Sequence, residues 1–539
     1  MEKAWKIKSK RVDKNSNDWL AKVLAKNRGL DTEQKLQEFL NPTIDQILNV
    51  QLTDVEKAIK RVEQALKNKE KIIIYSDYDA DGLCATAIMW ETLNDLGCNV
   101  LPYVPHRMTE GYGMSKNGIE KLAGEGANLI ITVDNGVTAV EQVKYAKSLK
   151  IDTIITDHHV LPATLPKSHS LVHSTNLCGA GVAWLFCWHL ISKLNPEYKE
   201  KLLEKLELAA LATIADLVPL IGGNRSIVKI GLEKIDKTKR PGIKALINQS
   251  RITGSIGTYE IGHIIAPRIN AMGRIGHGLD SLRLLCAKNQ TQADELASLL
   301  SKTNSKRQDL TVTAVDHAKS LVNLDQLVGV ISHESWHEGV IGLVASRLVE
   351  VHYKPMVVIS RGGKFSKGSA RSIPGFNIVE AIRGSSQYLV DAGGHPMAAG
   401  FTIETRHIEA FTQSINTHAQ KFMTDEILTP TIEIECELET GDINRKTLEI
   451  TEKFEPYGMG NPQPVFLSKN MLVEEIRTVG GGNEHLKLLV EGINAIGFNL
   501  GEFKARIRPG YKIDLVYTIA VDSYNGGLQI KIKDIALGN

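Results

Sequence analysis

The sequence has few cysteines and no large excess of charge of either sign. Its 539 residues include six cysteines, none of which forms a CxxC pair. This spacing argues against a disulfide scaffold and a cysteine-ligated zinc site, and it fits a reducing, cytoplasmic location. Lys and Arg number 64 against 62 Asp and Glu, a net charge of +2. No basic field covers the whole chain, so any surface that binds nucleic acid must be local.

Long apolar runs and low-complexity segments are also missing. The positively charged residues 1–19 are followed by no apolar stretch, which argues against a secretory signal. The most apolar window, residues 180–191, is too short to span a bilayer. The 42% of apolar and 23% of charged residues are typical of globular proteins, and the length corresponds to roughly three to four domains. We therefore expect a soluble protein of several domains, without a membrane partner.

Three short runs of β-branched residues indicate a parallel sheet. They span residues 71–77, 128–134 and 151–157, with helix-like stretches between them. This alternation predicts parallel strands that are joined by crossover helices. Each run ends in an aspartate, namely Asp77, Asp134 or Asp157. Because ligands of open α/β sheets bind beyond the carboxyl ends of the strands, we expect these carboxylates to converge in one crevice.

The other segments differ from this sheet in their periodicity. Strand-like runs at 328–333 and 355–360 indicate a second α/β domain. The pattern near the C-terminus is all-β, with turns expected at 480–483 and at Asn525-Gly526, and it suggests a five-stranded barrel of the OB type, a fold that binds single strands. The predicted fold class is α/β, with a helical N-terminal segment (1–70), a parallel-sheet domain (71–225), a helical connector (226–325), a second α/β domain (326–425) and an OB-type barrel (430–539).

Three acids follow the first predicted strand at alternate positions, Asp77, Asp79 and Asp81. Carboxylates this close repel one another unless a cation compensates their charge. A solvated acidic loop or a calcium loop is the alternative interpretation. An EF-hand needs a glutamate at its twelfth position, where this sequence has Ile88. The triplet therefore favours a different kind of metal site.

Further metal-ligating residue types follow the other strands and one apolar helix. Asp134 follows the second strand, His158 and His159 follow the third, and Asp216 ends a long apolar helix. Burying the Asp216 charge without a partner would cost several kcal/mol, on the order known for isolated ions. Carboxylates with imidazole suit divalent first-row metals, with Mn²⁺ favoured over Zn²⁺ where oxygen ligands predominate. The set is large enough for two ions that share a carboxylate, an arrangement suited to in-line displacement at phosphorus.

Several motifs, in the same order along the chain, resemble a known superfamily. DYDADG (77–82), VDNG (133–136), DHH (157–159) and IADLVP (214–219) resemble the motifs of the DHH phosphoesterases, whereas segments 336–347, 367–372 and 393–400 resemble their associated DHHA1 domain. PHRMTEGYG (105–113), APRINAMGR (266–274) and PYGMGNPQP (456–464), followed by a barrel, narrow the resemblance to the RecJ family. Members of this family are single-strand-specific 5′→3′ exonucleases that act in DNA repair and recombination.

The resemblance implies roles for the acids and histidines. It makes Asp79, Asp81, Asp134, His158 and Asp216 the ligands of two Mn²⁺ or Mg²⁺ ions, with Asp134 bridging them. Asp77 would orient the cluster, and His159 would position the water or stabilise charge at phosphorus. The implied reaction is a two-metal-ion hydrolysis of phosphodiesters that releases 5′-mononucleotides. No Walker lysine loop is present, which argues against ATP-driven chemistry.

A locally basic segment, residues 361–371, points to an anion site. It carries four basic residues and no acid, although a solvated hairpin would explain the same pattern. Arginine binds phosphate bidentately, and glycine lets a backbone approach it closely. The resemblance makes Arg107, Arg274, Ser369 and Arg371 the pocket for a 5′-terminal phosphate, His395 a contact to the nucleotide, and Arg268 and Asn270 supports of the pocket wall. Arg347 could belong to this anion site or could equally pair with an acid inside the second α/β domain.

Two other functions remain open at this point. A DHH enzyme for smaller substrates, such as a cyclic dinucleotide, an oligoribonucleotide or pyrophosphate, would share the metal site but give the barrel no role. A scaffold that binds single strands without cutting them would have broken ligands. The resemblance also implies single-stranded DNA, a single-strand-binding protein and a RecQ-type helicase as partners, and a monomeric state. One or two of the barrel aromatics would stack on bases, from Phe466, Phe498, Tyr517 and Tyr524.

Overall fold

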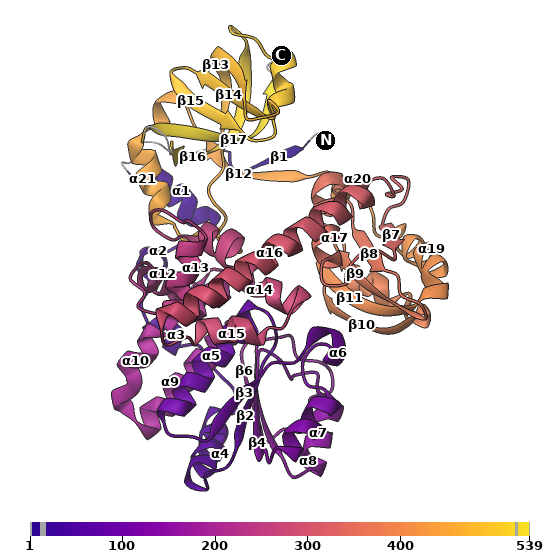
Figure 1. Ribbon diagram of the computed structural model, residues 1–539. Coiled ribbons are helices and arrows are strands. Elements are labelled where there is room, and N and C mark those ends of the chain that lie inside the picture. Colours follow the sequence, from indigo (N-terminus) through magenta and orange to yellow (C-terminus); the bar gives the residue numbers. More distant parts are fainter. Residues whose placement is uncertain (1–2, 11–17, 523–525, 538–539) are drawn as a thin grey trace. The chain divides into compact units, whose positions relative to one another are not determined.

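The computed structural model describes residues 3–10, 18–522 and 526–537, and these form two compact units (Figure 1). The larger unit comprises residues 50–216 and 231–430. The smaller unit is assembled from three stretches of the chain, 1–49, 217–230 and 431–539, as far as these are described. No helix of the described ranges is long and apolar enough to cross a membrane.

The larger unit contains the predicted parallel sheet. Its five strands have the order β3-β2-β4-β5-β6 and are all parallel. They are β2 (Ile72–Tyr75), β3 (Val100–Tyr103), β4 (Leu129–Val133), β5 (Asp152–Asp157) and β6 (Ser170–His173). The three strands expected from β-branched runs are thus confirmed as β2, β4 and β5. β3 and β6 were not expected, since neither has a run of β-branched residues like that of β2, and β3 contains Pro102.

Helices cover both faces of this sheet. Figure 1 shows α5 (Ala80–Asp95) and α9 (Gly179–Leu194) on one side, and α7 (Lys116–Gly124) and α8 (Val140–Ser148) on the other. α5 and α9 also pack against α11 (Leu206–Ala215) and are apolar nearly all round, as expected of helices enclosed in a core. The remaining helices here are α4 (Val55–Lys67), α6 (Arg107–Glu110) and α10 (Lys199–Glu204).

The expected helical connector leads from this sheet to the second α/β domain. Its elements are α13 (Pro241–Gln249), the π-helix η2 (Glu260–Ile265), α14 (Ala266–Ile275), α15 (Leu279–Leu285) and α16 (Gln290–Lys319). α16 packs against α13 and α14 near its start and against α17 (Ile341–His352) farther along. One long helix therefore contacts both the connector and the second α/β domain.

The second α/β domain has a mixed sheet of order β10-β11-β9-β8-β7. The two expected strands are found as the parallel pair β7 (Gly329–His333) and β8 (Met356–Ser360). β9 (Phe365–Arg371), β10 (Leu389–His395) and β11 (Ala398–Glu404) continue the sheet antiparallel. The basic segment 361–371 is thus part of the β8–β9 hairpin. The helices after α17 are α18 (Ile378–Arg383), α19 (Ile408–Ala419) and α20 (Asp425–Leu428).

The smaller unit contains the expected five-stranded barrel. Its strands are β13 (Phe466–Val479), β14 (His485–Val490), β15 (Ile493–Gly497), β16 (Lys512–Val521) and β17 (Leu528–Leu537), and pairing of β13 with β16 closes it. The expected turn at 480–483 joins β13 to β14. Asn525 of the other expected turn lies outside the described residues.

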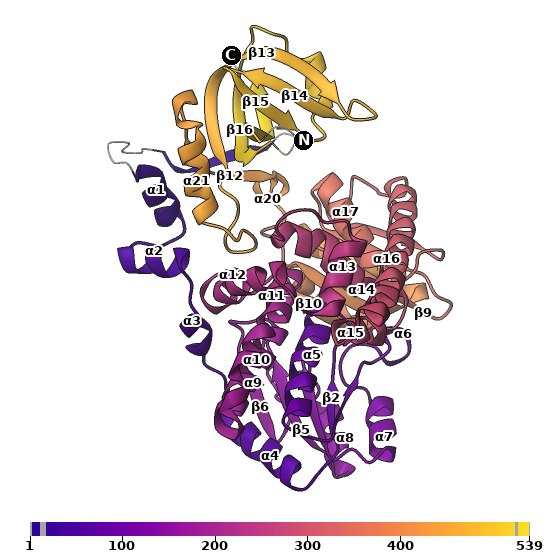
Figure 2. The ribbon, with the colours of Figure 1, turned by 60° about the vertical axis from the view of Figure 1, so that its left-hand side comes forward.

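The expected helical N-terminal segment (1–70) begins with a strand. β1 (Ala4–Ser9) is a strand that pairs in parallel with β12 (Thr431–Glu437). Its sequence AWKIKS alternates apolar and charged residues, and Trp5 and Ile7 pack beside Ile434. The helices of this unit are α1 (Trp19–Asn27), α2 (Glu33–Leu40), α3 (Asp45–Leu48), α21 (Arg445–Lys453) and the start of α12 (Gly222–Asp236), with α1 beside α21 (Figure 2).

A buried arginine joins the three stretches of the smaller unit. Arg225 is 1% exposed, and its guanidinium donates hydrogen bonds to the carbonyl oxygens of Phe39, Phe454, Glu455 and Pro456 over 2.6 to 3.3 Å. The guanidinium also lies 3.7 Å from the centre of the Phe39 ring. Burial lowers the pKa of Arg225 to about 10, which leaves it cationic at neutral pH.

We expect Arg225→Met to lower the free energy of unfolding of this unit by about 3 kcal/mol, because buried carbonyl groups lose a charged donor. The measurement is calorimetric unfolding of the full chain. Arg445→Met, at an exposed arginine of the same unit, is the matched control and should change stability by less than about 0.5 kcal/mol. Equal stability of both variants would contradict the structural role of Arg225.

Candidate metal centre and phosphate-binding cavity

The turn between β2 and α5 carries the first three acids. Asp79 is the N-cap of α5, and its side chain accepts hydrogen bonds of 3.0 Å from the backbone N–H groups of Asp81 and Gly82. Asp77 is buried at the start of the turn. Burial and the neighbouring Asp79 carboxylate raise the pKa of Asp77 well above its usual value. The local sequence thus folds into a tight turn that holds like charges together.

The carboxylate of Asp81 lies at the start of another helix. It accepts hydrogen bonds of 2.7 Å from the N–H groups of both Gly179 and Ala180, in the first turn of α9. The positive end of a helix dipole favours a negative charge at this place. Burial and the Asp79 carboxylate nevertheless raise the pKa of Asp81 to about 7. Repulsion and desolvation therefore raise the pKa of Asp81 by more than the helix N-terminus lowers it.

Asp134 lies directly after β4 and is 3% exposed. Its backbone is left-handed, with φ at 62°, a conformation that aspartate adopts more readily than branched residues. Burial and the Asp81 carboxylate raise the pKa of Asp134 well above its usual value. Within the described part of the chain, Oδ1 of Asp134 and Oδ1 of Asp77 have no hydrogen-bond partner. Each of these buried oxygens thus lacks a hydrogen bond, although Nε2 of His158 lies close to Oδ1 of Asp134.

His158 lies among three of these acids. Its Nε2 is 3.1 Å from Oδ1 of Asp134, 3.6 Å from Oδ2 of Asp216 and 3.8 Å from Oδ2 of Asp81. Burial and the neighbouring His159 lower the pKa of His158 to about 4, so the ring is neutral at pH 7. A neutral imidazole is the form that binds a metal. Asp216 follows the end of α11, and burial with the Asp81 carboxylate raises its pKa to about 9.

Asp157, the third strand-end acid, contacts His159 and the backbone around it, and it belongs to none of the metal-ligand groups found among the described residues. Its carboxylate accepts hydrogen bonds from the N–H groups of Val137 (3.0 Å) and His158 (2.7 Å), and it lies 2.7 Å from Nδ1 of His159. Burial alone would lower the pKa of His159, but the hydrogen bond and charge of Asp157 raise it to about 9. Asp157 therefore fixes the backbone at His158 and orients the ring of His159, which it keeps protonated at neutral pH. The DHH motif contains this acid, but its spacing does not distinguish an orienting residue from a ligand.

Groups of three side chains in this cluster could each hold a metal ion. In each group the donor atoms lie within 4.8 Å of one another, and the groups are Asp77, Asp79 and Asp134; Asp81, His158 and Asp216; and Asp134, His158 and His159. The two unpaired carboxylate oxygens and the raised pKa values of four acids are what a bound dication would relieve. Oxygen donors with an imidazole fit Mn²⁺ or Mg²⁺. The structure thus brings together all five residues expected as ligands.

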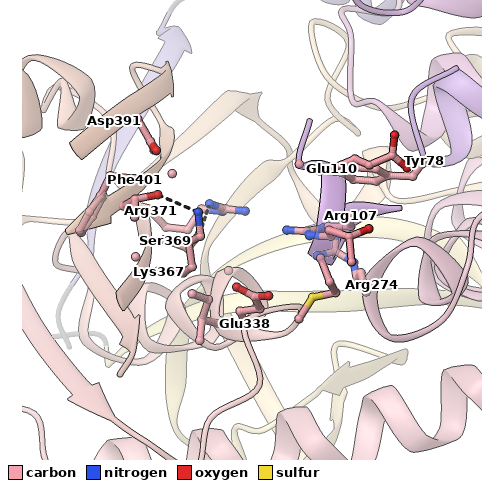
Figure 3. A pocket seen from close by; sticks show the side chains of 18 residues that line it. Tyr78, Arg107, Glu110, Arg274, Glu338, Lys367, Ser369, Arg371, Asp391 and Phe401 are labelled. Atoms are coloured by element: carbon pink, nitrogen blue, oxygen red, sulfur yellow. Dashed lines mark hydrogen bonds between the residues drawn. The ribbon is translucent and has the colours of Figure 1, made fainter. Parts of the chain in front are cut away.

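A cavity of about 460 Å³ contains the expected phosphate-binding residues. Figure 3 shows Arg107 and Arg274 on one side of it and Ser369 and Arg371 on the other. Its lining also includes Tyr78, Glu110, Glu338, Lys367, Asp391 and Phe401. The Arg107 guanidinium lies 5.2 Å from the centre of the Tyr78 ring. Burial with the charges of Arg107 and Arg371 lowers the pKa of Arg274 to about 10, which is the crowding of cations expected where an anion binds.

A second cavity, of about 1050 Å³, adjoins the histidines. His159 and His395 both line it, and their rings stack with centres 6.0 Å apart and an interplanar angle of 18°. Residues 160–163 add an apolar wall. Tyr78 and Gly400 line both cavities, so the two are neighbours. The structure therefore places His395 beside the metal-ligand candidates, where the resemblance expects a contact to the nucleotide.

Two residues expected in the wall of the phosphate pocket line neither cavity. Arg268 donates hydrogen bonds to the carbonyl oxygen of Ile264 (2.5 Å) and to the hydroxyl of Ser301 (3.3 Å), within the helical connector. The side-chain oxygen of Asn270 accepts a hydrogen bond of 2.7 Å from the N–H of Ala80. Lys367 and Tyr78 line the pocket without having been expected there. Lys367 lies in the basic segment 361–371, so the sequence alone could have identified it as a pocket residue.

Comparison with family models gives three matches along the chain. The model described as "DHH family, N-terminal domain" matches residues 71–215, "DHHA1 domain" matches 323–421, and "RecJ OB domain" matches 434–534.

Curated proteins and solved structures resemble nearly the whole chain. The single-stranded-DNA-specific exonuclease RecJ of Bacillus subtilis is 35% identical over 99% of this chain and 70% of its own length. The protein of the same name from Escherichia coli is 31% identical over 96% and 95%. The crystal structure of RecJ from Thermus thermophilus with Mn²⁺ covers 99% of this chain and 80% of its own, with a TM-score of 0.87 at 28% identity, and the structure with Mg²⁺ has a TM-score of 0.80 at 28% identity over 99% and 79%. Both ions are ones that the acid cluster suits.

We expect Mn²⁺ binding to release protons and to weaken as the pH falls. At pH 7 without metal the cluster still holds protons, because burial and neighbouring carboxylates raise the pKa of Asp216 to about 9 and that of Asp81 to about 7. Bound carboxylates must be deprotonated, so the metal competes with these protons. Calorimetric titration in two buffers of different ionisation enthalpy measures the release, which should be about one proton or more per chain. A binding enthalpy that does not depend on the buffer would contradict this electrostatic description.

Proposed function

Because the chain belongs to the RecJ family of single-stranded-DNA-specific exonucleases, we propose that it degrades single-stranded DNA from the 5′ end and releases 5′-mononucleotides. The observation that carries this proposal is the adjacency of two sites in one compact unit. Tyr78 lies in the turn of the metal-ligand candidates and also lines the arginine-rich cavity. A strand end held in that cavity would have its first phosphodiester near the acid cluster.

We assign the metal ligands as Asp79, Asp81, Asp134, His158 and Asp216, with Asp134 shared between two ions. Support for the sharing comes from Asp134, whose oxygens belong both to a group with Asp77 and Asp79 and to a group with His158. Two bound divalent ions would supply the activation of water and the neutralisation of charge at phosphorus. Asp77 orients the cluster. The protonated His159 supplies a further positive charge for the phosphate that is attacked.

The proposed reaction is hydrolysis of the phosphodiester between the first two nucleotides. The oxygen of water forms a bond to phosphorus, and the bond from phosphorus to O3′ of the terminal nucleotide breaks. O3′ takes up a proton, and the terminal nucleotide leaves as a 5′-mononucleotide. The shortened strand carries a new 5′-phosphate, which is the group that the arginine-rich cavity suits.

The same cavity accounts for the proposed 5′→3′ direction. Arg107, Arg274 and Arg371 present guanidinium groups to a space of about 460 Å³, and Ser369 adds a hydroxyl. A terminal phosphate carries more negative charge than an internal phosphodiester and has a nucleotide on one side only. Preference for an end over an interior position follows from both properties.

Selectivity for single strands is proposed to arise in the second cavity, with the barrel holding the incoming strand. Among the barrel aromatics, Phe466 and Tyr517 have no exposed surface and belong to the core, whereas Phe498 is 54% exposed. Phe498 is therefore available for stacking on a base. Tyr524 lies outside the described residues. A DHH enzyme for small substrates would leave the barrel without a role, and a scaffold that does not cut would need no complete ligand set.

Several further properties of this proposal rest on the family resemblance. They are a role in DNA repair and recombination, a single-strand-binding protein and a RecQ-type helicase as partners, a monomeric state and a cytoplasmic location.

Asp134→Ala should abolish both Mn²⁺ binding and nuclease activity, because it removes the carboxylate shared by the two proposed ions. We expect at least about a 1000-fold fall in kcat, in line with the loss of several kcal/mol of transition-state stabilisation. Single-turnover digestion in Mn²⁺, with metal affinity measured calorimetrically, gives both quantities. Near wild-type turnover with metal bound would falsify the ligand assignment.

The direction and the end pocket are tested together with end-labelled DNA. A long single strand labelled at its 5′ end should lose the label at once as a mononucleotide, whereas a 3′ label should remain until late. Arg274→Ala should lower kcat/KM about 10- to 100-fold on a 5′-phosphorylated strand and much less on a 5′-hydroxyl strand, because one charged contact is lost.

The control for this arm is Arg347→Ala, since Arg347 is exposed and pairs with Glu350 at 2.7 Å. Early release of the 3′ label would refute the direction. An equal loss on both kinds of 5′ end would refute the role of Arg274.

A further inference from the structure

Helix α14 contacts the turn that carries the proposed metal ligands. The side-chain oxygen of Asn270 accepts a hydrogen bond of 2.7 Å from the backbone N–H of Ala80. Ala80 stands between Asp79 and Asp81 and is the first residue of α5. At a helix start such N–H groups have no partner within the helix. The hydrogen bond from Ala80 to Asn270 therefore fixes the backbone between two proposed ligands from outside their own segment.

The next turn of α14 packs directly on the backbone of the same loop. A Cβ atom at Gly273 would lie 2.3 Å from the carbonyl oxygen of Tyr78, closer than any side chain can approach. The absence of a side chain lets the helix and the loop touch backbone to backbone. Tyr78 itself lines the phosphate cavity and stands under the Arg107 guanidinium. The contact at Gly273 thus sets how far the helix stands from the loop.

The C-terminal turn of α14 reaches the phosphate cavity. Arg274, the residue after Gly273, lines that cavity, and Figure 3 shows its side chain beside Arg107. A Cβ atom at Gly339 would lie 2.1 Å from the carbonyl oxygen of Arg274, and Nη1 of Arg274 is 3.5 Å from the carbonyl oxygen of Gly339. The helix end is thereby held against the segment that precedes α17 in the second α/β domain.

We propose that α14 is the spacer that fixes the distance between the 5′-phosphate cavity and the metal-ligand turn, with Asn270 and Gly273 as its positioning residues. The inference rests on the proposed function of both sites. Asn270 acts through Ala80 and not on the substrate, which replaces the role expected from its motif. A helix resists bending, so a phosphate bound at Arg274 keeps a constant distance from the proposed ligands Asp79 and Asp81. A misplacement of about 1 Å between bound groups can cost on the order of 100-fold in rate.

The first test separates metal binding from end binding. Asn270→Ala should weaken Mn²⁺ about 10- to 100-fold, as expected when a group that orients metal ligands is removed. The same variant should bind a 5′-phosphorylated oligonucleotide in EDTA as wild type does. Asn270→Asp keeps an oxygen acceptor for the Ala80 N–H and should recover most of the metal affinity. Asn248→Ala, at an exposed asparagine of α13, is the matched control.

The second test asks whether two intact sites can be put out of alignment. Gly273→Ala should lower kcat about 100-fold at saturating Mn²⁺ and DNA. The affinity for Mn²⁺, and that for the 5′-phosphorylated oligonucleotide in EDTA, should each stay within about threefold of wild type, a difference of less than about 1 kcal/mol. Gly124→Ala is the control, since a Cβ atom at this helical glycine would meet nothing within 4 Å. Loss of rate without loss of either binding step is the signature of a spacer.

Each result supports or overturns the inference. Wild-type kcat in Gly273→Ala, or a rate loss that follows lost metal or DNA affinity, would overturn the spacer. Unchanged Mn²⁺ affinity in Asn270→Ala would overturn the role of Asn270, and this arm decides alone if Gly273→Ala does not fold. Failure of the proposed function is a separate result, because wild-type protein would then release no 5′-mononucleotides while the Mn²⁺ titrations could still be read.

Discussion

Repulsion between buried carboxylates is the constraint on which the rest of the larger unit depends. Asp77, Asp81 and Asp134 are almost fully enclosed, and burial together with the nearby acids raises the pKa of each. The fold opposes this repulsion with the N-terminus of α9 at Asp81, whereas His158, 3.1 Å from Oδ1 of Asp134, is neutral. Neither supplies a full positive charge at the unpaired oxygens. These oxygens therefore lack a compensating positive charge, which a divalent cation provides.

The two adjacent histidines of the DHH motif have opposite pKa shifts. His158 and His159 are adjacent in sequence, yet burial holds the pKa of one at about 4, whereas Asp157 holds that of the other at about 9. The His158 ring is therefore a neutral metal-ligand candidate in the acid cluster. The His159 ring is a cation that lines the larger cavity. The difference arises from burial at His158 and from the side-chain contact of Asp157 with His159, and not from the identity of either residue.

Much of this arrangement could be predicted from the sequence, for a definite reason. Strands β2, β4 and β5 are β-branched and parallel, so the residues after them had to meet at one edge, as Asp77 and Asp134 do. The orientation of Asp157 could not be predicted, because it depends on the loop that brings Val137 to it. Asn270 belongs to a motif with phosphate-binding residues, but only the packing of α14 on α5 reveals its partner.

The composition of the smaller unit has a consequence for how the chain folds during synthesis. β1 pairs with β12, and Arg225 joins residues near 39 to residues near 455, so this unit is discontinuous and the larger unit is inserted within it. At about 5–20 residues per second, the ribosome needs roughly 20–80 s to pass from residue 50 to residue 430. Through that interval Trp5, Ile7 and the apolar side of α1 have no sheet to cover them. Residues 4–9 are thus among the last to fold, although they are synthesised long before their partner β12.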